Sequence, residues 1–179
     1  SPQNPYAMTH LLSENICSYY NKNSSSECIN VRLSNSFGSP VFYNNNCWWL
    51  VINDLCRNAL SDNMIKLSSD GTPQRDFIHI NNVIKAIETL IQKSTNGISN
   101  IFHIASSKTR TIHEISYKVK QVFKDRYGKN INIFLKDGKV SNEPQNSNLT
   151  SRYTISNDKL KSLGCKIDTD LGYGINELF

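Results

Sequence analysis

Short segments typical of β-strands alternate along this chain with longer segments that have the apolar spacing of helices. The strand-like segments, rich in β-branched residues, lie at residues 28–33, 64–67, 77–80, 101–105 and 131–135. Helices are expected from Pro5 to the polar stretch 21–26, over 47–60, from Asn81 or Asn82 to before residue 96, from a capping box of Thr111 and Glu114 to near Gly128, and over a short stretch that Ser156 or Asn157 caps and Gly164 ends. This alternation predicts an α/β fold with at least some parallel strand pairing.

Three polar stretches rich in Gly, Pro, Asn or Ser separate these elements and are expected as loops, namely residues 34–40, 68–73 and 136–151. The last of them is long enough to be mobile. Residues 153–155 are expected to be extended. One segment leaves two alternatives open, because residues 48–52 alone also fit a strand, although the apolar residues of 47–60 favour a buried helix.

The composition indicates a globular chain with a substantial core. Its 179 residues, 38% of them hydrophobic, suffice for one domain or for two small interleaved ones. No apolar run approaches the roughly 20 residues that span a bilayer, and the first residues lack a secretory signal pattern. The five cysteines are scattered and form no Cys-x-x-Cys pair, so we expect reduced thiols, no disulfide framework and a cytoplasmic location.

Charge and histidine spacing exclude several classes of partner. The net charge of +5 is spread along the chain, whereas nucleic-acid-binding proteins cluster basic residues on one face, so we expect neither a nucleic-acid nor a membrane partner. A small anionic ligand fits this charge. His79, His103 and His113 lack metal-ligand spacing and are expected as strand or surface residues, which predicts no metal site. Trp48 and Trp49 are candidates for stacking on a nucleotide base, although packing is the favoured role.

Tyr6 and His10 are the first candidates for chemistry. They stand four residues apart on the first helix, so both side chains project from one face. A cation beside a phenol favours the phenolate form, which lets a tyrosine exchange a proton in a carbonyl/alcohol redox step. On spacing alone, the alternative is a partly buried tyrosine beside a surface histidine.

Five segments, in order, resemble those of one family. PQNPYAMTHLLSE (2–14) resembles an active-site helix with the pattern Pro-x-x-x-Tyr-x-x-x-Lys followed by Glu, and VRLSNSFGSP (31–40) resembles Val-Arg-x-x-Asn-x-Tyr-Gly-Pro. DGTPQRDFIHINNVIKAI (70–87) is similar to a segment built around Arg-Asp-Phe-Ile-His-Val, and IFHIASSKTRTIHEI (101–115) and ISNDKLKSLG (155–164) are similar to two later segments. These are segments of the NAD-dependent epimerase/dehydratase family, the extended short-chain dehydrogenases that act on nucleotide-sugars. The resemblance covers nearly the whole chain, and RDFIHI is its most specific part.

The resemblance implies a fold and a division of the chain. It implies the carboxyl-terminal part of a doubly wound, NAD(P)-binding Rossmann-like fold, interleaved with a small α/β substrate-binding lobe. Residues 1–43 and 76–105 are then the remnant of the Rossmann-like domain, and residues 44–75 and 106–179 form the lobe.

The resemblance also assigns roles to single residues. Tyr6 is expected to be the catalytic acid/base beside the nicotinamide, with His10 in the position of its partner. Asn35 is expected to contact the sugar or its diphosphate, and Arg75 to pair with the diphosphate, since a guanidinium offers phosphate oxygens a planar fork. The alternatives are a loop-closing amide for Asn35 and a structural ion pair of Arg75 with Asp76 or another carboxylate.

Two departures from the family pattern bear on activity. His10 stands where the family has a lysine that holds the nicotinamide ribose, and histidine is shorter and less often charged at neutral pH. The chain also contains no Gly-x-Gly-x-x-Gly loop to bring backbone and a helix N-terminus to a pyrophosphate. We therefore expect NAD or NADP to bind the intact protein, with a nucleotide diphosphate-sugar as substrate, and this chain alone to bind no cofactor and to be inactive.

Three classes of function stay open. The first is the substrate-binding portion of an NAD(P)-dependent nucleotide-sugar epimerase, dehydratase or reductase, of which this chain is a fragment or truncated form. The second is a non-catalytic nucleotide-sugar binding or scaffold module, and the third is an interaction domain without a ligand. Because half a sheet leaves an edge that invites pairing, a homo-oligomer or reliance on a missing amino-terminal half is expected.

Overall fold

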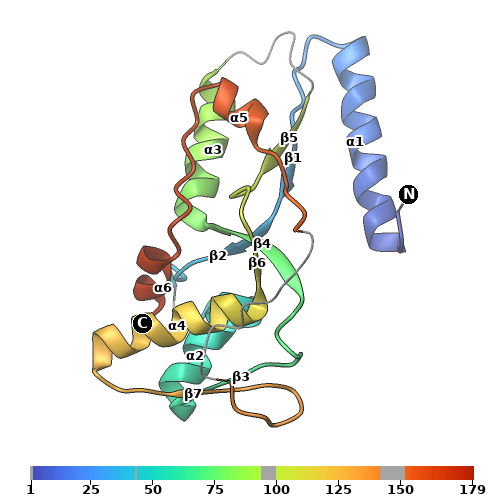
Figure 1. The fold of residues 1–179 in the computed structure, drawn as a ribbon. Helices are drawn as coiled ribbons and strands as arrows, with labels where there is room; N and C mark the ends of the chain where they lie inside the picture. The colour runs from blue at the N-terminus through green and yellow to red at the C-terminus, as the bar shows by residue number, and fades with distance from the viewer. Residues whose placement is uncertain (1, 43, 94–99, 142–151) are drawn as a thin grey trace.

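The computed structural model of the protein describes residues 2–42, 44–93, 100–141 and 152–179. The elements follow in the order α1 (Pro5–Asn23), β1 (Asn30–Leu33), β2 (Asn35–Phe37), α2 (Val51–Asp62), β3 (Met64–Lys66), β4 (Gln74–His79), α3 (Ile80–Gln92), β5 (Ile101–Ile104), β6 (Thr109–Thr111), α4 (Ile112–Tyr127), β7 (Asn132–Phe134), α5 (Asp158–Ser162) and α6 (Gly172–Leu178). Figure 1 shows α3 and α5 with β1 and β5 in the upper part, α2 and α4 with β3 and β7 in the lower part, and β2, β4 and β6 between them.

Strand pairing is mostly parallel. β1 pairs with β5, β2 with β4 and β3 with β7, all parallel, whereas β6 pairs antiparallel with β4. Parallel neighbours need long crossover connections, which are helical here. The structure therefore confirms the predicted mixed α/β architecture with parallel pairing.

Each of the two parts has its own apolar cluster, and both clusters include residues from the last quarter of the chain. The upper cluster packs α3 and β5 against the tail and contains Ile78, Val83, Ala86, Leu90, Phe102, Ile104, Leu160 and Cys165. The lower cluster joins α2, α4, β3 and β7 to α6, with Leu171, Ile175 and Leu178 from the tail. The domain boundaries expected at residues 43, 75 and 105 stay a prediction.

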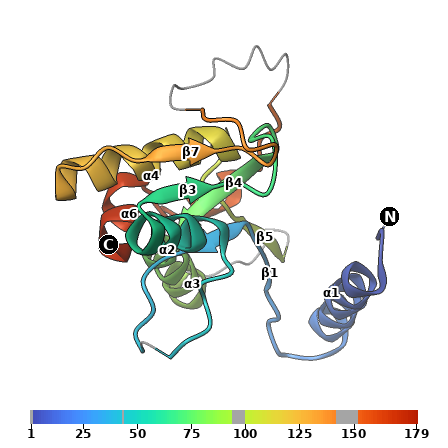
Figure 2. The ribbon, with the colours of Figure 1, turned by 90° about the horizontal axis from the view of Figure 1, so that it is seen from below.

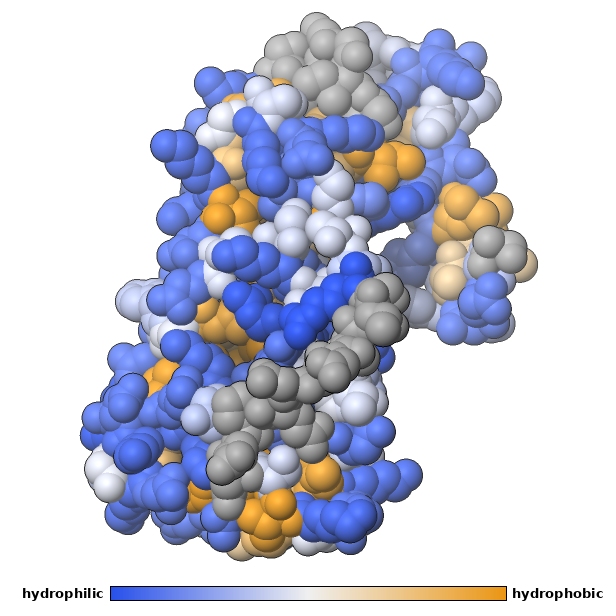
Figure 3. Space-filling model, viewed as in Figure 1, coloured by the Kyte–Doolittle hydropathy of each residue, from blue (hydrophilic) through white to orange (hydrophobic). Residues whose placement is uncertain are grey.

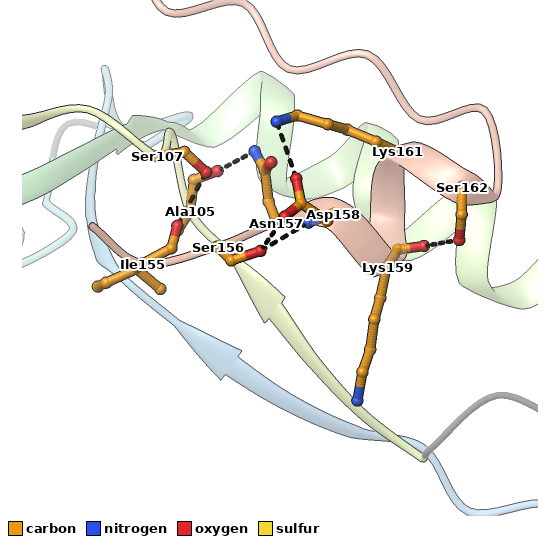
Figure 4. Close-up of polar contacts among 9 residues, drawn as sticks. All are labelled: Ala105, Ser107, Ile155, Ser156, Asn157, Asp158, Lys159, Lys161 and Ser162. Carbon is orange, nitrogen blue, oxygen red and sulfur yellow. Dashed lines mark hydrogen bonds and ion pairs between the residues drawn. The ribbon is translucent and has the colours of Figure 1, made fainter.

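Hydrogen bonds fix the carboxyl-terminal tail (residues 152–179) against the end of β5 (Figure 4). Asn157 is buried, and its side-chain amide donates to the carbonyl of Ala105 over 2.8 Å. The hydroxyl of Ser107 donates to the carbonyl of Ile155 over 2.8 Å. α5 then starts after Asn157, as predicted, and its Leu160 enters the upper cluster.

Asp76 on β4 is fully buried and joins three segments through its carboxylate and its backbone carbonyl. The carboxylate accepts hydrogen bonds from the backbone N–H and the hydroxyl of Ser106, at 2.9 and 3.0 Å, and from the backbone N–H of Lys108 at 3.1 Å. The Asp76 carbonyl accepts the side-chain amide of Asn35 at 2.9 Å. Buried carboxylates persist where donors surround them. The carboxylate thus ties the turn before β6 to β4, and the backbone carbonyl of the same residue ties β2 to β4.

Two expectations along the first half were wrong. Residues 35–37 form β2 rather than a loop, because they pair in parallel with β4 and bury Phe37. The helix expected from residue 47 starts only at Val51. Trp48 and Trp49 lie in the turn before it, where the Trp49 indole N–H donates to the carbonyl of Asn46 over 2.9 Å.

Three further differences concern the second half. α3 begins at Ile80, and Asn82 does not cap it but lies buried, donating its amide to the carbonyl of Asp168 over 2.8 Å. β6 and α6 were not expected, although Leu171, Ile175 and Leu178 have helical spacing. The capping box of Thr111 and Glu114 is confirmed, as is the end of α4 at Gly128, which adopts a left-handed conformation. The mobile loop expected over 136–151 lies mostly outside the described residues.

Replacing Asp76 with Ala is expected to lower the free energy of unfolding by about 2–4 kcal/mol, because the N–H groups of Ser106 and Lys108 lose a buried acceptor. Urea denaturation followed by circular dichroism measures this. The matched control is Asp62→Ala on the exposed end of α2, for which a change within about 0.5 kcal/mol is expected. Equal effects of the two substitutions would contradict the role given to Asp76.

Candidate functional site

Tyr6 and His10 lie together near the start of α1. The helix begins cleanly there, because Pro5 occupies its first position and the side chain of Asn4 accepts the N–H of Ala7 over 2.8 Å. One turn separates Tyr6 from His10, and their rings meet edge to face with centroids 4.5 Å apart. Tyr6 is 74% exposed, so its hydroxyl is free to meet a ligand.

The two side chains open into one cavity between α1 and β1. Its volume is 630 Å³, and its lining residues are Pro2, Tyr6, Ala7, His10, Leu11, Glu14, Val31, Arg32 and Leu33. Figure 3 shows open space between α1, on the right of the view, and the rest of the molecule. The cavity places a phenol and an imidazole beside apolar and charged side chains, which suits a ligand with a ring and hydroxyl groups.

One ion pair fixes α1 against β1 at this cavity. The guanidinium of Arg32 donates two hydrogen bonds to the carboxylate of Glu14, each 2.7 Å long. This bond to Arg32 lowers the pKa of Glu14, and the same contact raises the pKa of Arg32. α1 has no buried side chain, and Figures 1 and 2 show it standing to one side, so this bidentate pair sets the position of Tyr6 relative to β1.

Sequence reasoning missed the role of Arg32. The signal was present, since the helix pattern carries a Glu and the next segment begins Val-Arg.

A second contact holds the far end of α1. There the side chain of Asn21 donates to the carbonyl of Cys28 over 2.8 Å and accepts the N–H of Cys28 over 2.7 Å.

Asn35 and Arg75 lie on the neighbouring strands β2 and β4 but do not line the Tyr6 cavity. Asn35 donates its amide across the strands to the carbonyl of Asp76. Arg75 is exposed, and its guanidinium donates to the carbonyl of Gln74 over 2.7 Å. Within the described part of the chain, Arg75 forms no ion pair with Asp76, whose carboxylate is taken up by Ser106 and Lys108. The guanidinium of Arg75 therefore keeps donors for a ligand.

The other candidates occupy structural positions. His79 is buried with its Nε2 3.0 Å from the carboxylate of Glu177, and Nε2 of His113 lies 2.8 Å from the hydroxyl of Ser141. Trp48 packs on the lower cluster, whereas Trp49 is exposed. Over residues 2–42, 44–93, 100–141 and 152–179, no group of three His, Cys, Asp or Glu side chains has the geometry to hold a metal ion. No helix in the same ranges is both long and apolar enough to cross a bilayer.

No phosphate loop is found in the part of the chain that the structure describes. A dinucleotide pyrophosphate needs a glycine-rich turn between a parallel strand and a helix N-terminus. β4 runs directly into α3, and α4 starts at the capping box after β6. α6 starts at Gly172 but follows an irregular segment and has only seven residues.

Solved structures with the same fold are dinucleotide-binding enzymes. The chain aligns with UDP-glucuronic acid 4-epimerase from Bacillus cereus, in complex with UDP-glucuronic acid and NAD, at a TM-score of 0.70 and 22% identity, covering 99% of this chain and 52% of that one. It aligns with RMD from Pseudomonas aeruginosa, complexed with NADPH, at a TM-score of 0.73 and 18% identity, covering 99% and 56%. The predicted Rossmann-like fold class is thereby confirmed, and this chain corresponds to about half of it.

The sequence matches agree with the fold. Residues 1–105 match the NAD dependent epimerase/dehydratase family, and the chain belongs to that family. It is 24% identical over 163 residues to the trifunctional UDP-glucose 4,6-dehydratase/UDP-4-keto-6-deoxy-D-glucose 3,5-epimerase/UDP-4-keto-L-rhamnose-reductase of Arabidopsis thaliana, a match that covers 91% of this chain and 22% of that protein. A second trifunctional protein of this kind from A. thaliana matches at 22% identity, over 98% of this chain and 24% of its own length. The chain thus spans less than a quarter of these relatives.

Replacing Arg32 with Ala is expected to release α1, because that helix has little else to hold it. Hydrogen-exchange protection of the α1 amides should fall, whereas protection in α4 should not change. In the unchanged protein the pKa of Glu14 is lowered. The stabilisation that the Glu14–Arg32 ion pair gives α1 is therefore fully present above the ordinary glutamate pKa of 4.5, and it is lost as pH falls through the lowered pKa.

The matched control is Arg57→Ala, which breaks a surface ion pair with Asp54 on α2. It should leave the protection of α1 unchanged. If α1 stayed equally protected in the Arg32 variant, another contact would have to position Tyr6.

Proposed function

We propose that this chain is the substrate-binding portion of an NAD(P)-dependent enzyme that epimerises, dehydrates or reduces a nucleotide diphosphate-sugar. The observation that carries this proposal is the pair of Tyr6 and His10, exposed at one cavity on a helix that an ion pair fixes. Family membership supports it, and so do the ligands named for the solved relatives, UDP-glucuronic acid with NAD and, in another, NADPH.

Tyr6 is the proposed acid/base. As a phenolate it takes the proton of a sugar hydroxyl while the C–H bond on the same carbon breaks, and as a phenol it returns a proton when the carbonyl is reduced. When bound, the nicotinamide supplies the acceptor and donor of the hydride. His10, one helical turn away, holds the ribose end and, when protonated, favours the phenolate.

Asn35 and Arg75 are the proposed contacts to the sugar diphosphate. Arg75 is exposed with free donors, and a guanidinium binds phosphate oxygens in a bidentate manner. Asn35 keeps its amide oxygen available after donating to Asp76. Both side chains stand on strands that the buried Asp76 holds together, so the substrate contacts rest on a rigid base.

The exposed apolar surface of α1 and the side of β1 that pairs with no described strand indicate that another polypeptide segment covers them in the natural protein. The exposed apolar residues of α1 include Met8, Leu11, Leu12 and Ile16, and among the described strands β1 pairs with β5 alone. We propose that a second copy of this chain or an amino-terminal half covers them. The mass of the natural protein in light scattering decides between the two.

We also propose a cytoplasmic location, which the five free cysteines support.

A non-catalytic nucleotide-sugar binding or scaffold module is the second candidate, because His10 replaces the lysine of the family pattern. Turnover in the natural full-length protein separates the two. We expect Tyr6→Phe to reduce turnover by about 10²–10⁴-fold without weakening nucleotide-sugar binding, since only the proton donor is lost. Tyr19→Phe, also exposed on α1, is the matched control and should keep full activity.

A second variant of the same protein, His10→Lys, shows whether the histidine works in the reaction. Loss of turnover supports a working histidine, and a large gain supports a decayed active site. Absence of turnover in the unchanged protein with every epimerase, dehydratase and reductase substrate tried contradicts the enzymatic proposal and favours the binding module.

Replacing Arg75 with Ala is expected to weaken binding of UDP-sugars by about tenfold or more, because a charge-assisted contact to the diphosphate is removed. Isothermal titration calorimetry on the full-length protein measures this. Arg57→Ala serves as the control, since Arg57 is an exposed arginine already paired with Asp54. Equal affinity in the Arg75 variant and the unchanged protein would favour an interaction domain without this ligand.

A further inference from the structure

A second large cleft lies between α4 and the returning tail. Its volume is 840 Å³, and its walls come from residues 107–110, from the α4 side chains Glu114, Tyr117, Lys118 and Gln121, and from residues 152–154 and 168–171. It shares no lining residue with the cavity of Tyr6 and His10. Four separate stretches of the chain thus converge on a site to which the proposed function gives no role.

The carboxylates of this cleft are already occupied. Glu114 accepts Arg152 at 2.7 Å and the N–H of Thr111 at 2.8 Å. Asp168 accepts the N–H of Asp170 at 2.9 Å, and Asp170 accepts the N–H of Gly172 at 2.9 Å. Each of these carboxylates thus accepts a backbone N–H, and only Arg152 among the cleft cations forms an ion pair with any of them in the described part of the chain.

Two other cations, Lys108 and Arg110, donate to neutral oxygens of Thr169, and neither forms an ion pair with a described residue. The ammonium of Lys108 donates to the Thr169 hydroxyl over 2.7 Å, and Nη2 of Arg110 donates to the Thr169 carbonyl over 3.0 Å. Two positive charges are thereby drawn to one residue, where they repel each other. Lys118 lines the same cleft and forms no ion pair with a described residue.

Arg110 is the least satisfied of these groups. Its Nη1 is buried and has no hydrogen-bond partner among the described residues. Burial lowers the pKa of its guanidinium, although the nearby carboxylates of Glu114, Asp76 and Asp170 oppose this effect. A buried donor without an acceptor costs about 1–3 kcal/mol, so the hydrogen-bonding capacity of this guanidinium is not fully used within the described residues.

We propose that this cleft is an anion-binding site that takes a phosphate group between Arg110, Lys108 and Lys118. A phosphate offers several acceptor oxygens and up to two negative charges, which match a fixed guanidinium fork flanked by two ammonium groups. The site goes beyond the proposed function, because it requires neither Tyr6 nor the nicotinamide. Its ligand is free phosphate or the phosphate of a larger metabolite.

The test is titration of the chain with inorganic phosphate, followed by phosphorus NMR or calorimetry at neutral pH. We expect saturable binding that Arg110→Gln and, separately, Lys108→Gln each weaken by about tenfold or more. Arg57→Gln, which alters a paired surface arginine on α2, is the matched control and should bind as the unchanged chain does. Urea denaturation of each variant confirms that it is folded.

Three outcomes would overturn the proposal. They are no saturable phosphate binding by the unchanged chain, folded Arg110 and Lys108 variants that both bind like the control, or an Arg75→Gln variant that loses as much affinity as Arg110→Gln. The last result would place the phosphate at Arg75 on β4 instead. A parallel titration with adenosine monophosphate identifies the source: tighter binding than phosphate supports a nucleotide, and equal affinity supports the free anion.

Discussion

The hydrogen bonds of the buried Asp76 carboxylate hold the centre of this structure, because they join β4 to the turn before β6. Side chains along β4 alternate between its two faces, so Arg75 and Phe77 share one face and Asp76 and Ile78 share the other. Arg75 is exposed near the start of the strand, whereas Phe77 enters the lower apolar cluster and Ile78 the upper one. A single strand therefore carries a ligand candidate, the polar junction and one residue of each core.

The helix that bears Tyr6 is held in a different way. α1 buries none of its own side chains and relies on the pair of Glu14 and Arg32 and on Asn21. An exposed ion pair usually contributes little to stability, whereas a bidentate one determines orientation well. The Glu14–Arg32 pair thus orients the helix that carries the proposed acid/base, although it adds little to the stability of the protein.

Sequence reasoning predicted most of the elements and the fold class, because long amphipathic helices and apolar strands leave a periodic signal. The capping box at Thr111 and the end of α4 near Gly128 were predicted correctly, since both depend on local chemistry. β2 and β6 were missed because three-residue strands gain their stability from partners distant in sequence, and residues 35–37 alone resemble a turn.

The candidate site was likewise predicted from the sequence only in part. The meeting of Tyr6 and His10 on one helical face followed from spacing, and the structure brings them to one cavity. The role of Arg32 and the convergence of Lys108 and Arg110 on Thr169 did not follow, because each depends on how segments 18 to 61 residues apart fold against one another. No local pattern encodes such contacts.

The route of the tail has a consequence for how this protein can be divided. The chain contributes to the upper cluster through Leu160 and Cys165, and then returns to the lower cluster through Leu171, Ile175 and Leu178. Any single cut before residue 160 removes side chains from both cores at once. The two parts are therefore not separable modules that recombination could exchange by one crossover.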